Sequence, residues 1–318
     1  MARTRQQGMR MASHAGDWYS NNRAQLETQL TDWLAKVDPQ NPVEGCKAII
    51  APHAGYAYSG PAAAWAYKSI DTTGIKRVFL LGPSHHIYIN GCALSTCNVY
   101  HNIVGDLPLD LDTIRELRAT GKFEDISLAD DEAEHSLEMH LPYICKVFEG
   151  KDISIVPIVV GAIDQQQEAD FGALLAPYLA REDTICVVSS DFCHWGTRFS
   201  YTYYYPSPDT PAVRLSRSST PSAAHPIHTS IRKLDHDAMD LLADRPSEAH
   251  TRFAEYLEQT KNTICGRHPI GVLLGAMAKL RAPDRPEAEL RWVRYEQSSE
   301  CETVRDSSVS YASAWVKF

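Results

Sequence analysis

The sequence lacks the charge and hydropathy patterns of nucleic-acid-binding and membrane proteins. Its 31 Lys and Arg residues are outnumbered by 40 Asp and Glu, which gives a formal net charge of −9, and the basic residues form no stripe or basic helix. No apolar run approaches the roughly 20 residues of a membrane-spanning helix, and the N-terminus lacks the apolar segment of a secretory signal. We therefore expect no nucleic-acid partner, no membrane span and a location in the cytoplasm, with the nucleus as a second compartment.

Several common enzyme motifs are also missing. The chain has no GxGxxG, no P-loop and no GxSxG sequence, which argues against nucleotide binding and serine hydrolysis. Its 8 cysteines form no CxxC pair and show no regular spacing, so we interpret them as free thiols in a reducing compartment. Any chemistry must therefore come from side chains that the fold gathers from distant segments.

What the sequence does contain is a repeated unit, a short apolar run rich in β-branched residues that breaks into glycine, proline, serine and histidine. The runs are 48–51, 78–81 and 185–188, with a fourth at 155–160. Strands that are apolar on both faces are typical of a parallel sheet covered by helices on each side. Amphipathic patterns predict helices around 21–37, 110–119, 134–148, 164–180, 230–243, 247–259 and 269–281, and two further strands at 290–295 and 309–316.

These patterns predict an α/β fold with a mixed, largely parallel central sheet. No linker divides the chain into halves, so we expect one domain over residues 13–318, preceded by a flexible tail over 1–12. Residues 206–228 are rich in Pro, Ser, Thr and Ala and have no apolar period. We interpret this segment as an exposed, low-complexity insertion.

Histidines follow three of the predicted strands directly. His53, His85 and His194 stand at these positions, with His86, Asp191 and Cys193 beside them. Because the carboxyl ends of parallel strands meet at one edge of a sheet, we expect these side chains to converge there. By contrast, His135 and His140 are five residues apart and do not form an HExxH motif, so we predict only that they line or decorate a helix.

Cys265 is the second anchor of the predicted site. It lies just ahead of a helix with Pro269 in its first turn, and a helix N-terminus together with Arg267 and His268 favours the thiolate form. Gly266 would allow a close approach of the backbone to another group. Two imidazoles and a thiolate can hold a divalent first-row metal, with copper, zinc and iron all open, while Asp191 and His194 could orient a ligand or move protons.

Several longer motifs extend this set of residues over most of the chain. They are 13–19 (SHAGDWY), 51–56 (APHAGY), 82–86 (GPSHH), 134–143 (EHSLEMHLPY), 189–196 (SSDFCHWG), 262–274 (NTICGRHPIGVLL) and 306–312 (DSSVSYA). Together they closely resemble the Memo family. The insertion at 206–228 and the longer N-terminus resemble those of fungal-type members.

This resemblance implies a fold similar to the class III extradiol ring-cleaving dioxygenases of the LigB type. In that relation the metal ligands are His53, His85 and Cys265, and Asp191 and His194 lie alongside as catalytic candidates. Cysteine stands where those dioxygenases have a carboxylate, so ring cleavage is not expected. Copper- or iron-dependent redox chemistry is the activity associated with the family.

The resemblance also implies a link to cell motility and growth signalling downstream of receptor tyrosine kinases. In that setting the same pocket is proposed to receive phosphotyrosine peptides, and Trp18 matches a tryptophan associated with this binding. Three hypotheses therefore stay open. The first is a metal-dependent redox protein, and the second is a non-catalytic module that binds a peptide or small anion through imidazoles such as His86 and through Arg267. The third is a hydrolase or transferase with Cys265 as nucleophile and His194 or His53 as base.

Overall fold

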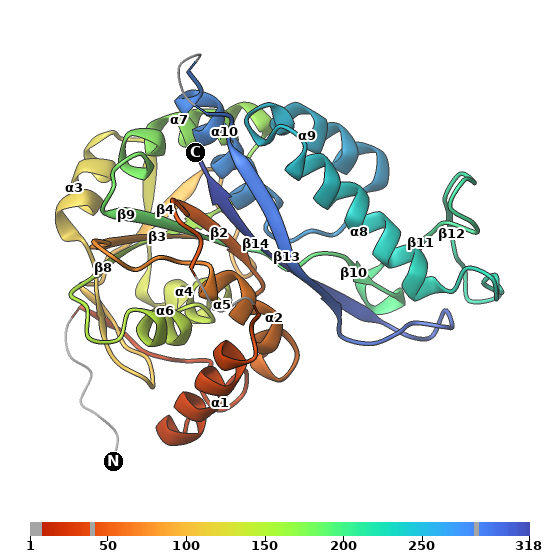
Figure 1. Cartoon of the computed structure of the whole chain (residues 1–318), viewed down its shortest axis with the longest axis horizontal. Coiled ribbons are helices and arrows are strands. Elements are labelled where there is room, and N and C mark those ends of the chain that lie inside the picture. Colours follow the sequence, from red (N-terminus) through yellow and green to blue (C-terminus); the bar gives the residue numbers. More distant parts are fainter. Residues whose placement is uncertain (1–7, 39–41, 283–285) are drawn as a thin grey trace.

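The computed structural model describes residues 8–38, 42–282 and 286–318, and within them one mixed nine-stranded sheet forms the centre of the molecule (Figure 1). Its four middle strands lie in the order β2, β9, β3, β8 and are parallel to one another. They span Ala48–Ala51 (β2), Thr184–Ser189 (β9), Arg77–Pro83 (β3) and Ser154–Val160 (β8). Nearly all their side chains are buried, which confirms the interpretation of the apolar runs as central strands.

The flanking strands make the sheet mixed. On one side β14 runs antiparallel to β2 and pairs with β13 and β10, while on the other β4 runs antiparallel to β8 and pairs with β7 in parallel. These strands span Ser308–Lys317 (β14), Glu289–Gln297 (β13), His194–Trp195 (β10), Cys92–Ser95 (β4) and Phe123–Ile126 (β7). The parallel part predicted from the sequence is thus the buried centre.

Helices cover both faces of this sheet (Figure 1). On one face α7 and α10 pack against each other and on β9, and α9 joins α10 to α8; on the other face α2 packs on β2 and β14 and is covered by α1 and α6. The helices span Arg23–Ala35 (α1), Tyr56–Lys68 (α2), Leu111–Ala119 (α3), Leu128–Ala133 (α4), His135–Glu138 (α5), Leu141–Val147 (α6), Gln165–Leu179 (α7), Ile227–Ala243 (α8), Ala249–Thr260 (α9) and Arg267–Leu280 (α10), with short 3-10 turns at Thr197–Phe199 and Pro246–Glu248. Among the residues that the structure describes, no helix is both long and apolar enough to cross a membrane.

Three helical regions differ from the sequence prediction, and one of them is α4, which was not predicted. The pattern over 56–68 was not predicted as a helix, because Gly60 and Pro61 interrupt it, yet α2 forms there. Gly60 is needed for packing, since a Cβ at this position would lie 2.5 Å from the ring of Trp33 on α1. The helix predicted over 134–148 is two short helices, α5 and α6, separated by Met139 and His140.

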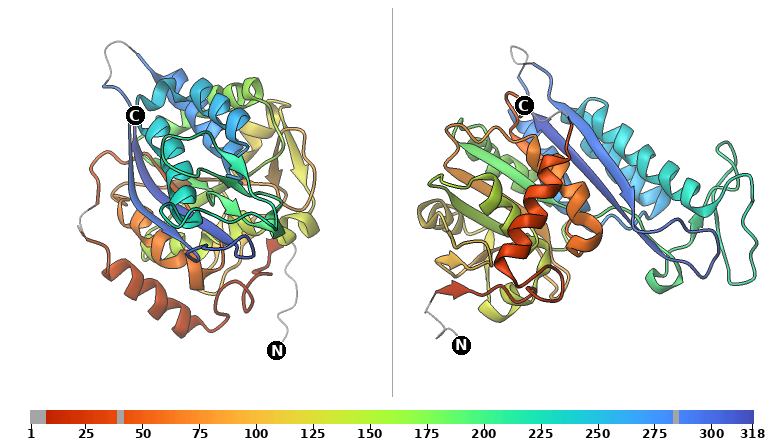
Figure 2. Two further views of the ribbon diagram at one scale, coloured as in Figure 1. Left: turned by 90° about the vertical axis from the view of Figure 1, so that its right-hand side faces the viewer. Right: turned by 60° about the horizontal axis from the view of Figure 1, so that its bottom comes forward.

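The N-terminal segment and the insertion also have structure of their own. Met9 and Arg10, assigned above to the tail, form β1, which pairs in parallel with β5 (Val99–Tyr100), and β5 in turn pairs with β6 (Leu107–Pro108). Residues 1–7 of the predicted tail lie outside the described residues. The segment 206–228 is mostly exposed and contributes β12 (Val213–Arg214), which pairs with β11 (Tyr203–Tyr204) in an arm that projects from the body (Figure 2), but its end is buried in α8 at Ile227.

Candidate metal centre

The three neighbouring strands β2, β3 and β9 end at the same edge of the sheet and bring their polar side chains together there. His53 follows β2, His85 follows β3 and Asp191 follows β9. The rings of His53 and His85 lie 5.2 Å apart between centroids, and His53 Nε2 is 4.0 Å from Asp191 Oδ2. His53 and Asp191 are more than 130 positions apart, yet they face one another because the parallel strands that they follow, β2 and β9, are adjacent in the sheet.

The hydrogen bonds of His53 determine which ring nitrogen is free. Its Nδ1 lies 2.6 Å from Ser189 Oγ, and that hydroxyl donates to the carbonyl oxygen of Ser136 at 2.7 Å. Because the hydroxyl has one hydrogen and the carbonyl can only accept, the proton between His53 and Ser189 is on Nδ1. Burial, followed by the charges of nearby histidines such as His85, lowers the pKa of His53 well below its usual value. His53 is therefore a neutral imidazole with a free lone pair on Nε2, the form that binds metal ions.

Glu134 fixes His85 in the same way. Its carboxylate accepts from His85 Nδ1 at 2.9 Å and from the backbone N–H of His85 at 2.6 Å. Burial alone would raise the pKa of Glu134, but these contacts and the N–H of Ser136 lower it to about 2, so the group is ionised and can only accept hydrogen bonds. Nδ1 of His85 therefore carries its proton, and the carboxylate leaves Nε2 as the available atom.

Cys265 reaches this pair from the loop before α10. Its Sγ lies 3.2 Å from His53 Nε2 and accepts from the backbone N–H of Asp191 at 3.3 Å. The expected close approach at Gly266 is observed, because a Cβ there would collide with the backbone oxygen of Ser189. The expected thiolate is wrong for the protein without a metal: burial, and then the negative charge of Asp191, raise the pKa of Cys265, and these effects exceed that of Arg267. The group is a thiol that can donate to His53.

A cavity of about 580 Å³ opens in front of these side chains. One wall carries His53, His85 and Asp191, together with Trp18. The second part of its lining, here called the open wall, consists of Tyr58, Arg198, Phe199 and the serines 298, 299, 307 and 308. Imidazoles, one buried carboxyl and one guanidinium group therefore belong to residues that line the same cavity.

Comparison with known proteins places this arrangement in a family. The model of the Memo-like proteins matches residues 10–315. The chain belongs to the Memo family. It is 45% identical to Protein MEMO1 of Xenopus laevis and 44% identical to Protein MEMO1 of Homo sapiens, each over 305 residues that cover 95% of both chains. It is 41% identical to the memo-1 homolog of Caenorhabditis elegans over 304 residues, covering 96% of this chain and 81% of that protein. Membership of the fungal branch stays a prediction.

The Memo motifs contribute unequally to the cavity. Trp18, His194 and Asp191 line it, whereas His86 is exposed and lies beyond His135, with ring centroids 6.0 Å apart. Arg267 lines a different cavity of about 490 Å³, with His268 and Lys261. The arginine that lines the cavity of the histidines is therefore Arg198, which was not predicted from the sequence.

His135 was also not predicted as a site residue, yet it lines the cavity. It opens α5, and its ring stacks on His85 at 4.4 Å and on Trp18 at 4.3 Å between centroids. One ligand nitrogen each from His53, His85 and His135 lie within 4.8 Å of one another, which is close enough to share a metal ion. Burial and the nearby charge of His85 lower the pKa of His135 to about 3, so it too is neutral at pH 7.

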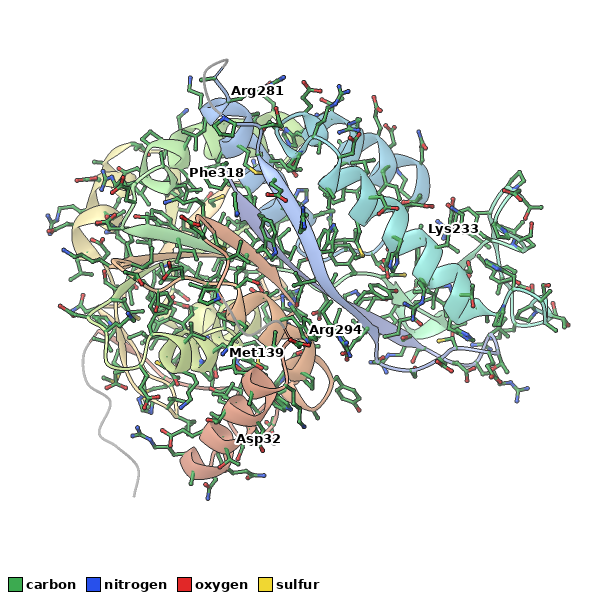
Figure 3. The ribbon with its side chains drawn as sticks, viewed as in Figure 1. Asp32, Met139, Lys233, Arg281, Arg294 and Phe318 are labelled. Carbon is green, nitrogen blue, oxygen red and sulfur yellow. The ribbon has the colours of Figure 1, made fainter. Side chains whose placement is uncertain are left out.

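The reason for this error lies in the local backbone. The predicted helix over 134–148 would have placed His135 and His140 on different faces, but the chain turns between α5 and α6. Met139, labelled in Figure 3, lies at this turn, and its carbonyl oxygen accepts from the hydroxyl of Tyr56 on α2 at 2.7 Å. The turn directs His135 into the cavity, while His140 is buried against Tyr67, 2.8 Å from its hydroxyl. Only the adjacent Glu134, which caps α5, offered a local signal.

Asp191 and His194 complete the polar groups of the cavity. Asp191 Oδ1 accepts from the backbone N–H groups of His53 and Ala54, and burial raises its pKa above the usual value. His194 Nδ1 lies 3.0 Å from the carbonyl oxygen of Thr263, which can only accept, so Nδ1 is protonated and Nε2 can accept a proton. The pair therefore offers the cavity a buried carboxyl with a raised pKa and an imidazole held in place through its Nδ1.

Proposed function

We propose that this Memo family protein binds a copper or iron ion between His53, His85 and Cys265 and is a metal-dependent redox protein. The observation that carries the proposal is the preset donor geometry: both imidazoles have Nδ1 occupied by a hydrogen bond, and the sulfur lies 3.2 Å from one of the Nε2 atoms. A set of two imidazoles and one thiolate suits copper, iron and zinc, and only the first two support redox chemistry.

Two imidazoles and a thiolate have the donor chemistry for such an ion, which would supply one-electron transfer that the side chains of the cavity do not provide. The other polar groups would then handle the substrate. Asp191 and His194 are the candidates for moving protons to or from a bound molecule, because Asp191 is buried beside His53 and the Nδ1 of His194 is held by the carbonyl oxygen of Thr263. Trp18 provides an apolar wall that excludes water beside the histidines. Extradiol ring cleavage is not part of the proposal, because Cys265 takes the place of a carboxylate ligand.

His135 is the competing third ligand, and a matched pair of variants distinguishes the two. Protein purified without a tag or chelator is loaded with Cu or Fe, and bound metal is counted per chain for wild type, Cys265→Ser and His135→Asn. The proposal expects one ion per wild-type chain, a loss in Cys265→Ser and retention in His135→Asn. The reverse order would replace Cys265 by His135 in the ligand set, and a wild-type protein that binds neither metal would end the proposal.

The second candidate is a non-catalytic module that binds phosphotyrosine peptides or small anions. The open wall supports it, because Arg198 is exposed there over the ring of Phe199, and Tyr58 lines the same cavity. Calorimetry on metal-free protein compares a phosphotyrosine peptide with its unphosphorylated form. Binding of the phosphorylated peptide alone, lost in Arg198→Gln and retained in Arg267→Gln, is the expected result for this candidate, and equal heats for both peptides exclude it.

A nucleophilic Cys265 has less support. Its nearest base is His53, at 3.2 Å, but burial disfavours the charged form of both groups and therefore the thiolate–imidazolium pair that such chemistry uses. A role in motility or growth signalling, in the cytoplasm and nucleus, is proposed from family membership only. It would follow from either of the first two candidates.

A further inference from the structure

We infer that the N-terminal segment 9–19, here called the strap, positions the histidine cluster, and that Arg10 and Glu138 are its positioning residues. The strap begins with β1, beside β5, and ends at Tyr19, with Trp18 against the cavity. Between these points it crosses α4 and α5, the segment that carries Glu134 and His135. The inference rests on the proposed metal site for one of its two readouts only.

Arg10 makes the first set of contacts. Its guanidinium is fully buried and donates from Nε to Asp131 Oδ1 at 3.1 Å, from Nη1 to Glu138 Oε2 at 2.7 Å and from Nη2 to the carbonyl oxygen of Glu134 at 2.9 Å. One side chain of the strap thus binds α4, α5 and the junction between them. The junction residue is Glu134, whose carboxylate orients His85.

Glu138 makes the second set. Its Oε1 accepts from the backbone N–H of His14 and from the hydroxyl of Tyr19, both at 2.9 Å, and its Oε2 accepts from His14 Nδ1 at 3.0 Å in addition to Arg10. A single carboxylate at the end of α5 therefore holds the strap at its start, middle and end. Within that span, Trp18 stacks on His135.

The energetics make α4 and α5 dependent on the strap. The two helices have 6 and 4 residues, too few to be stable by themselves, so their position is set by tertiary contacts. Arg10 faces two carboxylates, Asp131 and Glu138, whose side chains are at most 1% exposed. Removing the cation leaves buried negative charge without its partner, which is relieved most easily if α4 and α5 move toward water. Such a movement carries Glu134 away from His85 and His135 away from Trp18.

The test compares Arg10→Met with Arg115→Met in the full chain. Arg115 pairs with Asp112 on the surface, where the two side chains are 73% and 85% exposed. The same substitution there removes an ion pair that is in contact with water. Hydrogen exchange over residues 127–140 and the dissociation constant for Cu are measured below the unfolding transition. In Arg10→Met we expect hydrogen exchange over residues 127–140 to accelerate about 10-fold. We also expect Cu affinity to fall about 10-fold to 100-fold, which is the range for losing a group that supports a metal ligand. Neither change is expected in Arg115→Met.

Two outcomes overturn the inference. One is unchanged exchange over 127–140 in Arg10→Met, and the other is faster exchange with unchanged Cu affinity, since a merely structural strap would loosen the segment without altering the site. If Arg10→Met does not fold, Glu138→Gln is tested against the same two criteria. This substitution keeps the shape of the Glu138 side chain and removes its charge. A wild-type protein that binds no Cu refutes the proposed function, while the exchange measurement still decides whether the strap holds α4 and α5.

Discussion

The two walls of the cavity differ in how their side chains are held. On the fixed wall, His53 is 2% exposed and its free nitrogen is determined by Ser189, and Glu134 orients His85 in the same way. On the open wall, Tyr58 is 61% exposed and Arg198 lies over the ring of Phe199. The first wall is fixed where strands end, by hydrogen bonds that are buried at His53 and partly buried at His85. The second consists of the exposed first turn of α2, a 3-10 turn and serines beside β13 and β14. This difference is that expected between a site for an ion of fixed coordination and a surface that adapts to a larger ligand. Substitutions on the two walls should therefore differ in kind.

The largest effect is expected for the ligand itself. His53→Ala removes the imidazole shared by both candidate ligand sets, so Cu affinity should fall by more than about 100-fold, above the range for losing a supporting group. Competition against a chelator of known affinity measures the change. Because the substitution also leaves Ser189 without its partner, circular dichroism is recorded to confirm the fold. Tight binding in a folded His53→Ala protein would mean that the metal lies elsewhere.

The carboxylate of Glu138, which holds the strap, should make the free energy of unfolding depend on pH. Burial alone would raise the pKa of Glu138, but His14 and Arg10 lower it to about 2, from an ordinary value of 4.5. A carboxyl whose pKa is lower in the folded than in the unfolded chain contributes stability that is complete above pH 4.5 and is lost as the pH falls toward 2, about 3 kcal/mol in all.

Urea unfolding of wild type and Glu138→Gln at pH 7 and pH 3 measures this contribution. The difference in free energy of unfolding between the two proteins should shrink by more than half at pH 3. A difference that is equal at the two pH values would show that the charge of Glu138 is not what holds the strap.

A smaller effect on affinity is expected from the support of His85. Glu134→Gln replaces an obligate acceptor by an amide whose N–H₂ group can face His85 Nδ1, so the preferred tautomer is lost. Cu affinity should fall about 10-fold to 100-fold. Glu27→Gln, which removes the same charge from a surface ion pair with Arg23 on α1, serves as the control. Unchanged affinity in Glu134→Gln would mean that His85 needs no orientation or is not a ligand.

The smallest effects are expected on the open wall. Tyr58→Ala should change the free energy of unfolding by less than about 0.5 kcal/mol, because the side chain is mostly in water. It should leave Cu affinity unchanged and weaken only a ligand that contacts the ring. A loss of Cu affinity comparable with that of Glu134→Gln would remove the distinction between the two walls.

The sequence predicted the fixed wall better than the rest of the site. His53, His85 and Asp191 were placed together because apolar runs define strands and parallel strands end at one edge, a rule that needs only local patterns. His135 could not be placed this way, since its position depends on the turn at Met139, which tertiary contacts from Tyr56 stabilise. Arg198 was missed for a similar reason, because it lies in a short 3-10 turn after β10 that no repeating pattern in the sequence marks.

The same distinction applies to the fold. Continuous patterns gave the central strands and most helices, whereas α2 was hidden by Gly60 and Pro61, and the role of Gly60 becomes visible only when Trp33 packs on it. Arg10 was assigned to a tail because nothing local pairs with it, and its partners Asp131 and Glu138 lie more than 120 positions away. The thiolate expected at Cys265 was wrong because local sequence reports charges but not burial.

X-ray absorption at the metal edge of Cu- or Fe-loaded protein tests the central claim most directly. The account predicts one ion per chain with a first shell of imidazole nitrogens near 2.0 Å and one sulfur near 2.3 Å, and loss of the sulfur contribution in Cys265→Ser. A first shell of nitrogen and oxygen alone in the wild-type protein, unchanged by Cys265→Ser, would contradict it.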